Sequence, residues 1–238
     1  MLNRLLLYLK DLCFPASCVS CGQIVESEGL CSECWKQIKW ISDPKCKICG
    51  APFEFESDLI CGRCAKEKPR FDKAVAAFEY DDFSKNMIIR FKHGDSTRFC
   101  RQLATWTYRA GEEAIRNADL VVPVPIHFLK RLKRKYNQSE LLAREIAKLA
   151  GVAYEPRILR KKKRTPQQEG LSRNARLKNV GGSFGVSEKY ADLTRGRTIV
   201  LVDDVTTTGA TANECAKVLK KNGAEKVILL TVARVDLK

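Results

Sequence analysis

Four Cys-x2-Cys pairs near the start of the chain constrain its fold more than any other feature. Nine residues separate the first pair from the second, and eleven separate each later pair from the one before it. A two-residue gap lets both sulfurs of one tight turn face the same ion, and four thiolates in tetrahedral array form a structural zinc site. We therefore expect two such sites, built from Cys18, Cys21, Cys31, Cys34, Cys46, Cys49, Cys61 and Cys64.

The spacing leaves the pairing of these motifs open. Consecutive pairing would give two stacked zinc ribbons and interleaved pairing a cross-brace; we favour the consecutive arrangement. Sulfur would fill every coordination position, so neither ion would keep an open position for catalysis. The metal would instead stabilise a segment of about 50 residues whose few large apolar side chains form too small a hydrophobic core on their own. Redox or iron–sulfur chemistry fits less well, since a thioredoxin-like motif uses a single pair. The module could bind nucleic acid or a partner, or be a structural appendage.

Cysteine usage also indicates how the chain divides. Only Cys13, Cys100 and Cys215 lie outside the motifs, and we expect each to be a small buried residue. We predict an N-terminal helix and double zinc ribbon over residues 1–68 and a second domain over residues 69–238. The apolar run Leu5–Leu9 is too short for a signal peptide or a membrane span, so reduced thiols in the cytoplasm are expected.

The second domain alternates apolar runs with helical patterns, which indicates an α/β fold with a parallel sheet. Continuous apolar runs over 119–125, 198–203 and 226–233 are typical of strands buried on both faces. Residues 160–185 are basic, polar and rich in glycine, and we interpret them as a long loop.

Two helices are expected between these strands. Asn137 can cap the first, and Gly151 can end it. Leu142, Ile146 and Leu149 then share one apolar face. The second helix is predicted from about residue 210 to 222, with a glycine after it.

The stretch Leu201–Thr211 combines an apolar strand, the acids Asp203 and Asp204, a hydroxyl-rich turn with Gly209, and a helix start. Backbone N–H groups are unpaired at a helix N-terminus, and a glycine lets the backbone approach a phosphate closely. Carboxylates just before such a turn suit the vicinal hydroxyls of a ribose. A purely structural alternative is a strand end with capping threonines. The stretch is neither a P-loop nor a GxGxxG motif.

Positive charge is concentrated in one fifth of the chain. The net charge is +15, and 16 basic against 4 acidic residues lie between Lys130 and Lys178. Such a field attracts phosphate-bearing partners, small or polymeric. One run is either a solvated charge cluster or a contact for the backbone of single-stranded nucleic acid: Arg160, Lys161, Lys162, Lys163 and Arg164.

Five segments together resemble one known family: the paired Cys-x2-Cys motifs, 69–82, 91–95, 122–147 and 202–211. The last resembles the phosphoribosyl-pyrophosphate (PRPP) loop of type I phosphoribosyltransferases. The whole set resembles the ComF family of competence-associated, phosphoribosyltransferase-like proteins. This resemblance implies a type I phosphoribosyltransferase fold, a parallel sheet flanked by helices, preceded by a double zinc ribbon with four cysteines to each zinc ion.

The resemblance also implies roles for individual residues. Asp203 and Asp204 would contact the ribose hydroxyls of PRPP. Its 5′-phosphate would lie against Thr206, Thr207, Thr208, Gly209, Ala210 and Thr211. Arg131 and Lys135 would belong to the pyrophosphate loop, although Lys135 replaces the glycine that family members usually carry. A loop that closes over the reacting centre would contain Arg164, Gln168 and Arg176. Lys92 is a candidate phosphate contact or a solvated lysine.

The implied activity is a glycosyltransferase reaction, the transfer of phosphoribose from PRPP with Mg²⁺ to an acceptor that the sequence does not identify. The family resemblance also implies a role in DNA uptake during natural transformation. Single-stranded DNA and other competence or DNA-processing proteins would then be partners. Two hypotheses follow: a transferase, or a non-catalytic module that responds to PRPP or a nucleotide and binds single-stranded DNA.

Overall fold

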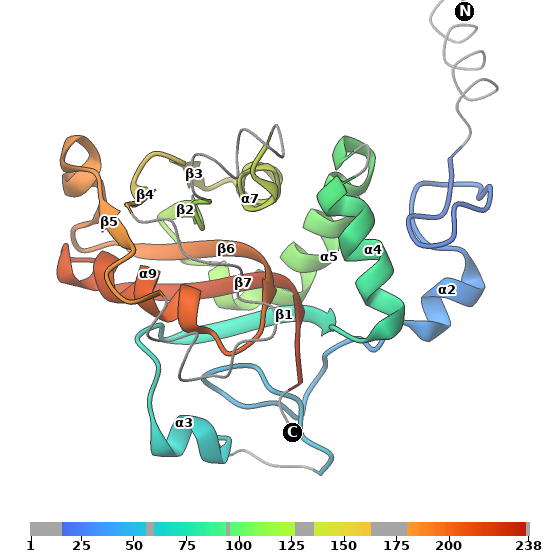
Figure 1. The fold of residues 1–238 in the computed structure, drawn as a ribbon, viewed down its shortest axis with the longest axis horizontal. Coiled ribbons are helices and arrows are strands. Elements are labelled where there is room, and N and C mark those ends of the chain that lie inside the picture. The colour runs from blue at the N-terminus through green and yellow to red at the C-terminus, as the bar shows by residue number, and fades with distance from the viewer. Residues whose placement is uncertain (1–15, 56–59, 94–95, 127–135, 163–179, 237–238) are drawn as a thin grey trace, which may run out of the picture.

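A five-stranded parallel sheet forms the centre of the protein (Figure 1). The computed structural model describes residues 16–55, 60–93, 96–126, 136–162 and 180–236. The strand order is β1-β7-β6-β2-β3, and every neighbouring pair is parallel. The strands are β1 (Lys73–Glu79), β2 (Leu120–Pro123), β3 (Ala153–Tyr154), β6 (Thr198–Thr206) and β7 (Lys226–Arg234).

Each of the three predicted apolar runs contains a strand, and the three strands β2, β6 and β7 lie next to one another in the middle of the sheet. The structure differs from this prediction in two ways. Strand β6 continues past the apolar run to Thr206, so Asp203 and Asp204 lie within the strand. Strand β1, in the segment 69–82, was not among the predicted strands; it pairs with β7 along its length.

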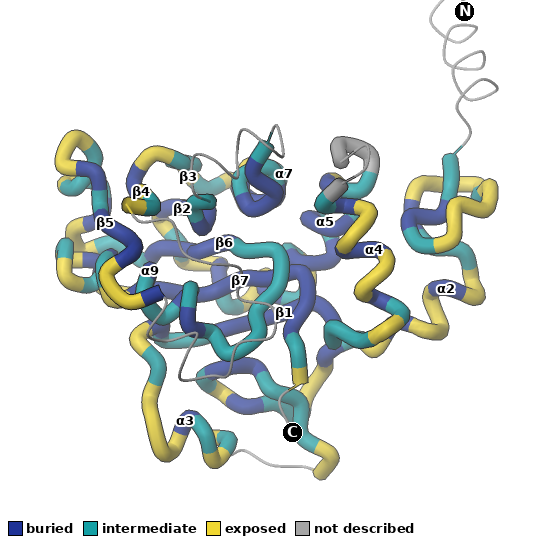
Figure 2. The backbone as a smooth tube through the Cα atoms, in the orientation of Figure 1, coloured by how far each residue is buried: buried dark blue, intermediate teal, exposed yellow. Residues whose placement is uncertain are grey.

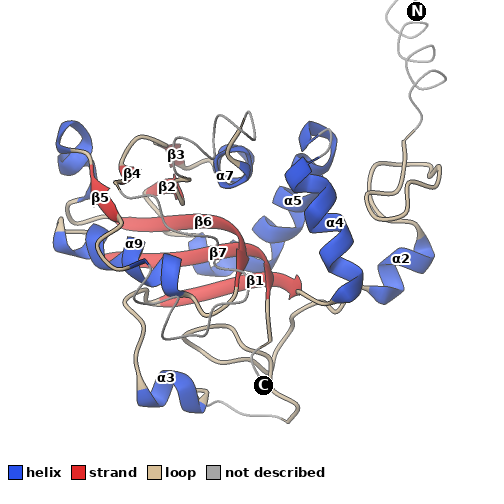
Figure 3. Cartoon of the chain, viewed as in Figure 1, coloured by secondary structure: helices blue, strands red, loops and turns tan. Residues whose placement is uncertain are grey.

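Helices cover both faces of the sheet (Figure 3). On one face α4 (Asp82–His93), α5 (Ser96–Ile115) and α7 (Gln138–Ala150) supply Phe91, Leu103 and Ile146 to the core. On the other face α9 (Ala210–Lys221) supplies Cys215 and Leu219. Alternate residues of the central strands point to the two faces, which is why the runs are apolar at every position.

The predicted helix boundaries of α7 are correct. The Asn137 side chain accepts a hydrogen bond from the Ser139 amide, and Gly151 takes a left-handed conformation with φ of 66°. Leu142 and Ile146 are buried as expected. Leu149 is 43% exposed, which corrects the predicted apolar face, because this residue lies in the last turn of the helix.

The interpretation of 160–185 as a loop is wrong at both ends of that segment. Strand β4 (Leu159–Lys161) pairs antiparallel with β5 (Phe184–Val186) in a separate two-stranded sheet. Three-residue strands are too short for an alternating pattern to reveal them. A 3-10 helix, η1 (Glu188–Thr194), follows β5.

The cysteine-rich segment packs along the edge of the sheet at β1, which would otherwise expose unpaired backbone groups. Trp40 forms an antiparallel bridge with Phe78, and the Ile41 amide donates to the Ala77 carbonyl over 3.0 Å. This segment contains the short helices α2 (Ser32–Gln37) and α3 (Gly62–Lys66). Figure 2 shows that burial is concentrated in the central sheet, whereas much of the segment's outer surface is exposed. No helix in the described part of the chain is long and apolar enough to cross a membrane.

Candidate metal centres and phosphate site

The eight motif cysteines form two clusters, in the consecutive pairing that we favoured. In each cluster the four sulfur atoms lie within 4.8 Å of one another. The first consists of Cys18, Cys21, Cys31 and Cys34, and the second of Cys46, Cys49, Cys61 and Cys64. Backbone amides point at these sulfurs: the Cys61 amide donates to Cys46 Sγ over 3.3 Å and the Cys34 amide to Cys31 Sγ over 3.4 Å. Such sets of four thiolates fit structural zinc.

The two clusters have different surroundings. Cys21 of the first cluster is exposed. In the second cluster, Cys46, Cys49 and Cys64 are buried and belong to the same apolar core as α9. A zinc ion with four thiolates has a net charge of about −2, so a nearby cation stabilises it. Arg63 Nη2 donates to Cys49 Sγ over 3.8 Å, and the guanidinium of Arg234, which is 3% exposed, donates to the Cys49 carbonyl.

Asp203 and Asp204 lie near the carboxyl end of β6 with their carboxylates held in place. Ser139 Oγ donates to Asp203 Oδ1 over 2.8 Å, and the Asp204 amide donates to the same oxygen over 2.9 Å. The Val205 amide donates to Asp204 Oδ1, and Lys92 Nζ lies 2.9 Å from Asp204 Oδ2. The lysine comes from α4 and the serine from α7, so three of the segments that resemble the family meet at this point.

Burial and the neighbouring carboxylate of Asp204 both oppose ionisation of Asp203. Together they raise the pKa of Asp203 to about 7, although the Ser139 hydroxyl and the Asp204 amide act in the opposite direction. Perturbed carboxylates of this kind are typical of functional sites.

The turn after β6 brings backbone N–H groups close to the acid pair Asp203 and Asp204. Gly209 has φ of 76° and is the N-cap of α9, a conformation that favours glycine. The Thr208 hydroxyl accepts from the Ala210 amide over 3.3 Å. A pocket here is lined by most of the residues predicted for PRPP, namely Asp203, Thr206, Thr207, Gly209, Ala210 and Thr211. Thr208 faces a second pocket on the side of the zinc-binding segment.

Comparison with known proteins now places the chain among relatives. It is 34% identical over 228 residues to Competence protein F of Haemophilus influenzae, which covers 93% of this chain and 98% of that protein. The chain belongs to the ComF family. ComFC of Bacillus subtilis, named a competence protein, is 24% identical over 87% of this chain and 85% of its own length. The DNA utilization protein YhgH of Escherichia coli K12 is 28% identical over 87% and 90% respectively.

Two domain families match separate parts of this ComF chain. The double zinc ribbon domain matches residues 9–65 and the phosphoribosyl transferase domain matches residues 137–236. The first range contains both cysteine clusters, and the second contains the acid pair and the turn that starts α9. The type I phosphoribosyltransferase fold, with a double zinc ribbon of two four-cysteine clusters, is thereby confirmed.

Several residues predicted from the ComF resemblance lie outside the described residues: Arg131, Lys135, Arg164, Gln168 and Arg176. Lys163 of the basic run also lies outside them. The same holds for the predicted N-terminal helix and for Cys13. Of the basic run, Arg160, Lys161 and Lys162 are described. They lie on or next to β4, where Arg160 and Lys162 are exposed and Lys161 Nζ lies 5.4 Å from the centroid of the Phe184 ring. Cys100 and Cys215 are buried, as expected.

Sequence reasoning did not identify Ser139 as a partner of Asp203, nor Lys92 as a partner of Asp204. Ser139 lies in the family-like segment 122–147, for which no role of this side chain was predicted. Lys92, in the segment 91–95, was predicted as a phosphate contact or a solvated lysine, and its ammonium group pairs with Asp204 in the structure. Arg63 and Arg234, the cations beside Cys49, were also missed. Their positions depend on how the cysteine-rich segment packs against the sheet.

Proposed function

We propose that this protein binds PRPP with Mg²⁺ at the end of β6 and acts as a phosphoribosyltransferase-type protein in the handling of DNA during natural transformation. The observation that carries the proposal is the placement of Asp203 and Asp204 directly before the Gly209 turn that starts α9. This arrangement offers carboxylates for ribose hydroxyls and N–H groups for a phosphate within one short stretch.

Each part of the site would have a distinct task. The N–H groups of the turn, with the hydroxyls of Thr207 and Thr211, would bind the 5′-phosphate of PRPP. The carboxylates of Asp203 and Asp204, held by Ser139 and Lys92, would accept hydrogen bonds from the ribose hydroxyls. Their negative charge would also stabilise positive charge that develops on the ribose as the bond between C1 and pyrophosphate breaks. Catalysis would then rest on positioning and electrostatics.

Mg²⁺ prefers oxygen ligands and keeps several of its waters, so an all-protein cage is not required. Asp203 and Asp204 are the residues that would hold it, together with oxygens of the substrate. Once bound, the ion would neutralise the departing pyrophosphate. The basic residues Arg131 and Lys135 are proposed to contribute charge there as well.

The names of the relatives support the cellular part of the proposal. Competence protein F and ComFC are named for competence, and YhgH is named for DNA utilization. These relatives match this chain over 85–98% of their own length. Single-stranded DNA and other DNA-processing proteins are the partners that we infer from these names.

The charge distribution favours a second candidate, a module that binds PRPP without turnover and contacts single-stranded DNA. Most of the +15 net charge lies between Lys130 and Lys178, which exceeds what one pyrophosphate requires. Arg160 and Lys162 at β4 are exposed and could contact a phosphate backbone.

Two measurements separate the candidates. Release of pyrophosphate from PRPP and Mg²⁺, with water or an added nucleobase taking the phosphoribosyl group, supports the transferase if it is lost in Asp203→Asn. PRPP binding without release supports the second candidate, provided that oligonucleotide binding survives Asp203→Asn and fails in Arg160→Ala/Lys162→Ala. Saturable binding of PRPP is common to both, and its absence contradicts both.

A further inference from the structure

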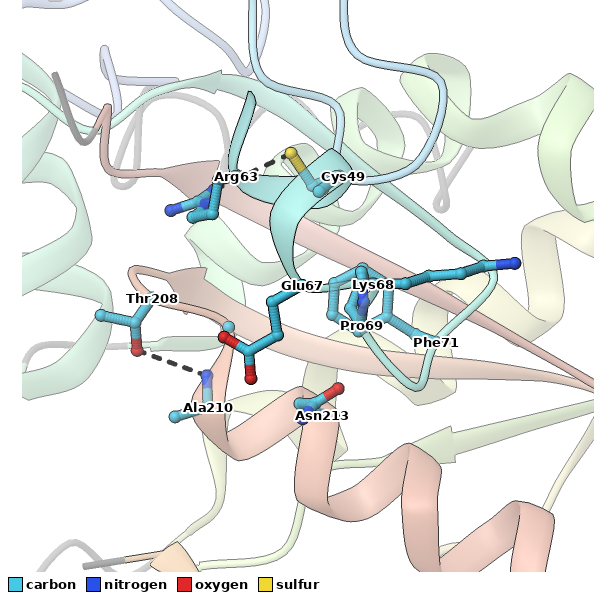
Figure 4. A pocket seen from close by; sticks show the side chains of 11 residues that line it. Cys49, Arg63, Glu67, Lys68, Pro69, Phe71, Thr208, Ala210 and Asn213 are labelled. Carbon is cyan, nitrogen blue, oxygen red and sulfur yellow. Dashed lines mark hydrogen bonds between the residues drawn. The ribbon is translucent and has the colours of Figure 1, made fainter. Parts of the chain in front are cut away.

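A second pocket lies on the other side of the same turn, between the second zinc ribbon and the start of α9 (Figure 4). One wall consists of Thr208, Gly209 and Ala210 of the turn, with Asn213 of α9. The opposite wall comes from α3 and the residues after it, including Arg63, Glu67 and Lys68. The zinc ribbon and the proposed phosphate site therefore share a boundary.

The ribbon is anchored at this boundary from several sides. The Arg70 amide donates to Asn213 Oδ1, which ties the chain after α3 to α9. The Ile48 carbonyl accepts from the Ala74 amide over 2.6 Å, which ties the Cys46–Cys49 knuckle to β1. Phe71 packs against the turn, since its ring lies 3.6 Å from the position of a Cβ on Gly209. A group carried by α3 thus has a defined position relative to the turn.

Arg63 and Glu67 bring opposite charges into this pocket. One guanidinium N–H of Arg63 points at Cys49 Sγ, so the positive charge of Arg63 lies beside the second cysteine cluster, in the pocket that the turn also lines. Figure 4 shows the Glu67 side chain directed toward Ala210 and Thr208, whereas Lys68 points away from them. A carboxylate near a helix N-terminus is attracted by the same N–H groups and dipole that bind phosphate.

We propose that the second zinc ribbon sets the ligand affinity of the phosphate site through charge: from the second pocket, the guanidinium of Arg63 attracts the 5′-phosphate held by the turn, and Glu67 opposes it by placing a carboxylate at the same helix end. This inference rests on the proposed function, because it assumes that the turn binds the phosphate of PRPP. It adds an attracting and an opposing charge from outside the phosphoribosyl transferase domain. It also gives the second zinc ion a role in positioning the charge that attracts the ligand.

The test compares charge changes on one short segment by titrating zinc-replete protein with PRPP and Mg²⁺. Arg63→Ala should weaken binding about three-fold, because a positive charge near the turn is lost. Arg63→Lys should recover part of the loss. Glu67→Gln should tighten binding about three-fold, as expected for removal of a charge at a helix terminus. Lys66→Ala is the matched control, since Lys66 is exposed on α3 and does not line the pocket.

Zinc content, measured on the same samples, separates binding from folding. Opposite effects of Arg63→Ala and Glu67→Gln at an unchanged two zinc ions per chain support the proposal. Equal affinities of these variants and the wild type overturn it while leaving the proposed function intact. If Arg63→Ala loses zinc, its affinity does not report on ligand binding, and Glu67→Gln becomes the deciding variant because Glu67 lies outside the Cys61–Cys64 motif. An unchanged affinity for PRPP in Glu67→Gln then overturns the proposal. No PRPP binding by the wild type overturns the proposed function itself.

Discussion

The ammonium group of Lys92 lies 2.9 Å from Asp204 Oδ2 at the carboxyl end of β6. Both side chains are partly buried, with 24% of the lysine and 16% of the aspartate exposed. The pair joins the end of α4 to the acid pair. The lysine therefore offsets the charge of one of two adjacent carboxylates that would otherwise repel each other.

A double-mutant cycle tests this pair. Lys92→Met leaves the Asp204 carboxylate without its cation and should lower the free energy of unfolding by about 1–2 kcal/mol, between the values for exposed and buried pairs. Asp204→Asn should lower the free energy of unfolding much less in the Lys92→Met background than in the wild type, with a coupling energy of about 1 kcal/mol. Urea unfolding of the four proteins measures this. Effects that add within about 0.3 kcal/mol would show that the two groups do not interact.

Asp203→Asn should stabilise the protein, and more so at high pH. The folded protein raises the pKa of Asp203 to about 7, so between the unfolded and folded pKa values the native state binds more protons. The free energy of unfolding therefore falls as pH rises through this window, and this loss is complete only above pH 7. Asparagine does not titrate and keeps the same shape.

The stability difference between Asp203→Asn and the wild type should grow by about 1 kcal/mol from pH 6 to pH 8. Urea unfolding at both values, with zinc present, measures it. Ser139→Ala is a useful companion, since removal of its hydrogen bond to Asp203 Oδ1 should raise the pKa further. A constant difference between pH 6 and pH 8 would contradict the assigned titration.

Zinc should leave the two clusters at different rates. Cys21 of the first cluster is exposed, whereas three sulfurs of the second are buried in the core beside α9. A chromogenic chelator should therefore report two phases, one equivalent of zinc each. Cys21→Ser should remove the fast phase only. A single phase, or loss of the slow phase in Cys21→Ser, would contradict the different burial of the two sites.

Two glycines in equivalent motif positions should differ in their tolerance of alanine. Gly22 and Gly50 both follow a Cys-x2-Cys pair and both have positive φ, 82° and 67°. A Cβ on Gly50 would lie 2.6 Å from the Ala74 carbonyl oxygen, whereas one on Gly22 would meet only the end of the Arg90 side chain at 3.9 Å. Gly22→Ala should lower the free energy of unfolding by about 1 kcal/mol, because alanine strains the backbone at positive φ.

Gly50→Ala should cost about 2 kcal/mol more, because the second ribbon must move away from β1. Thermal unfolding of both variants measures the difference. Equal losses in the two variants would mean that the ribbon is not closely packed on the strand.

The features that were predictable from sequence are local ones. Ligand spacing predicts the two zinc clusters, and the succession of apolar strand, acids, glycine and helix predicts the β6–α9 turn. Strand β1 was missed because its small apolar residues carry no distinct strand signal, and β4 and β5 because they are three residues long. Lys92 and Ser139 approach the acid pair from distant parts of the chain, and Arg63 and Glu67 approach the turn. Their roles depend on tertiary packing, which a local pattern does not encode.

Calorimetric titration of the zinc-replete protein with PRPP and Mg²⁺ tests the central claim most directly. Wild-type protein should bind one equivalent saturably. Asp203→Asn/Asp204→Asn, which removes both charges at constant shape, should lose at least about a hundred-fold in affinity, since each lost contact to a charged group is worth about 1.5–3 kcal/mol. The double variant should still contain two zinc ions and unfold cooperatively. Absence of binding by the wild type, or equal binding by the double variant, would contradict the account.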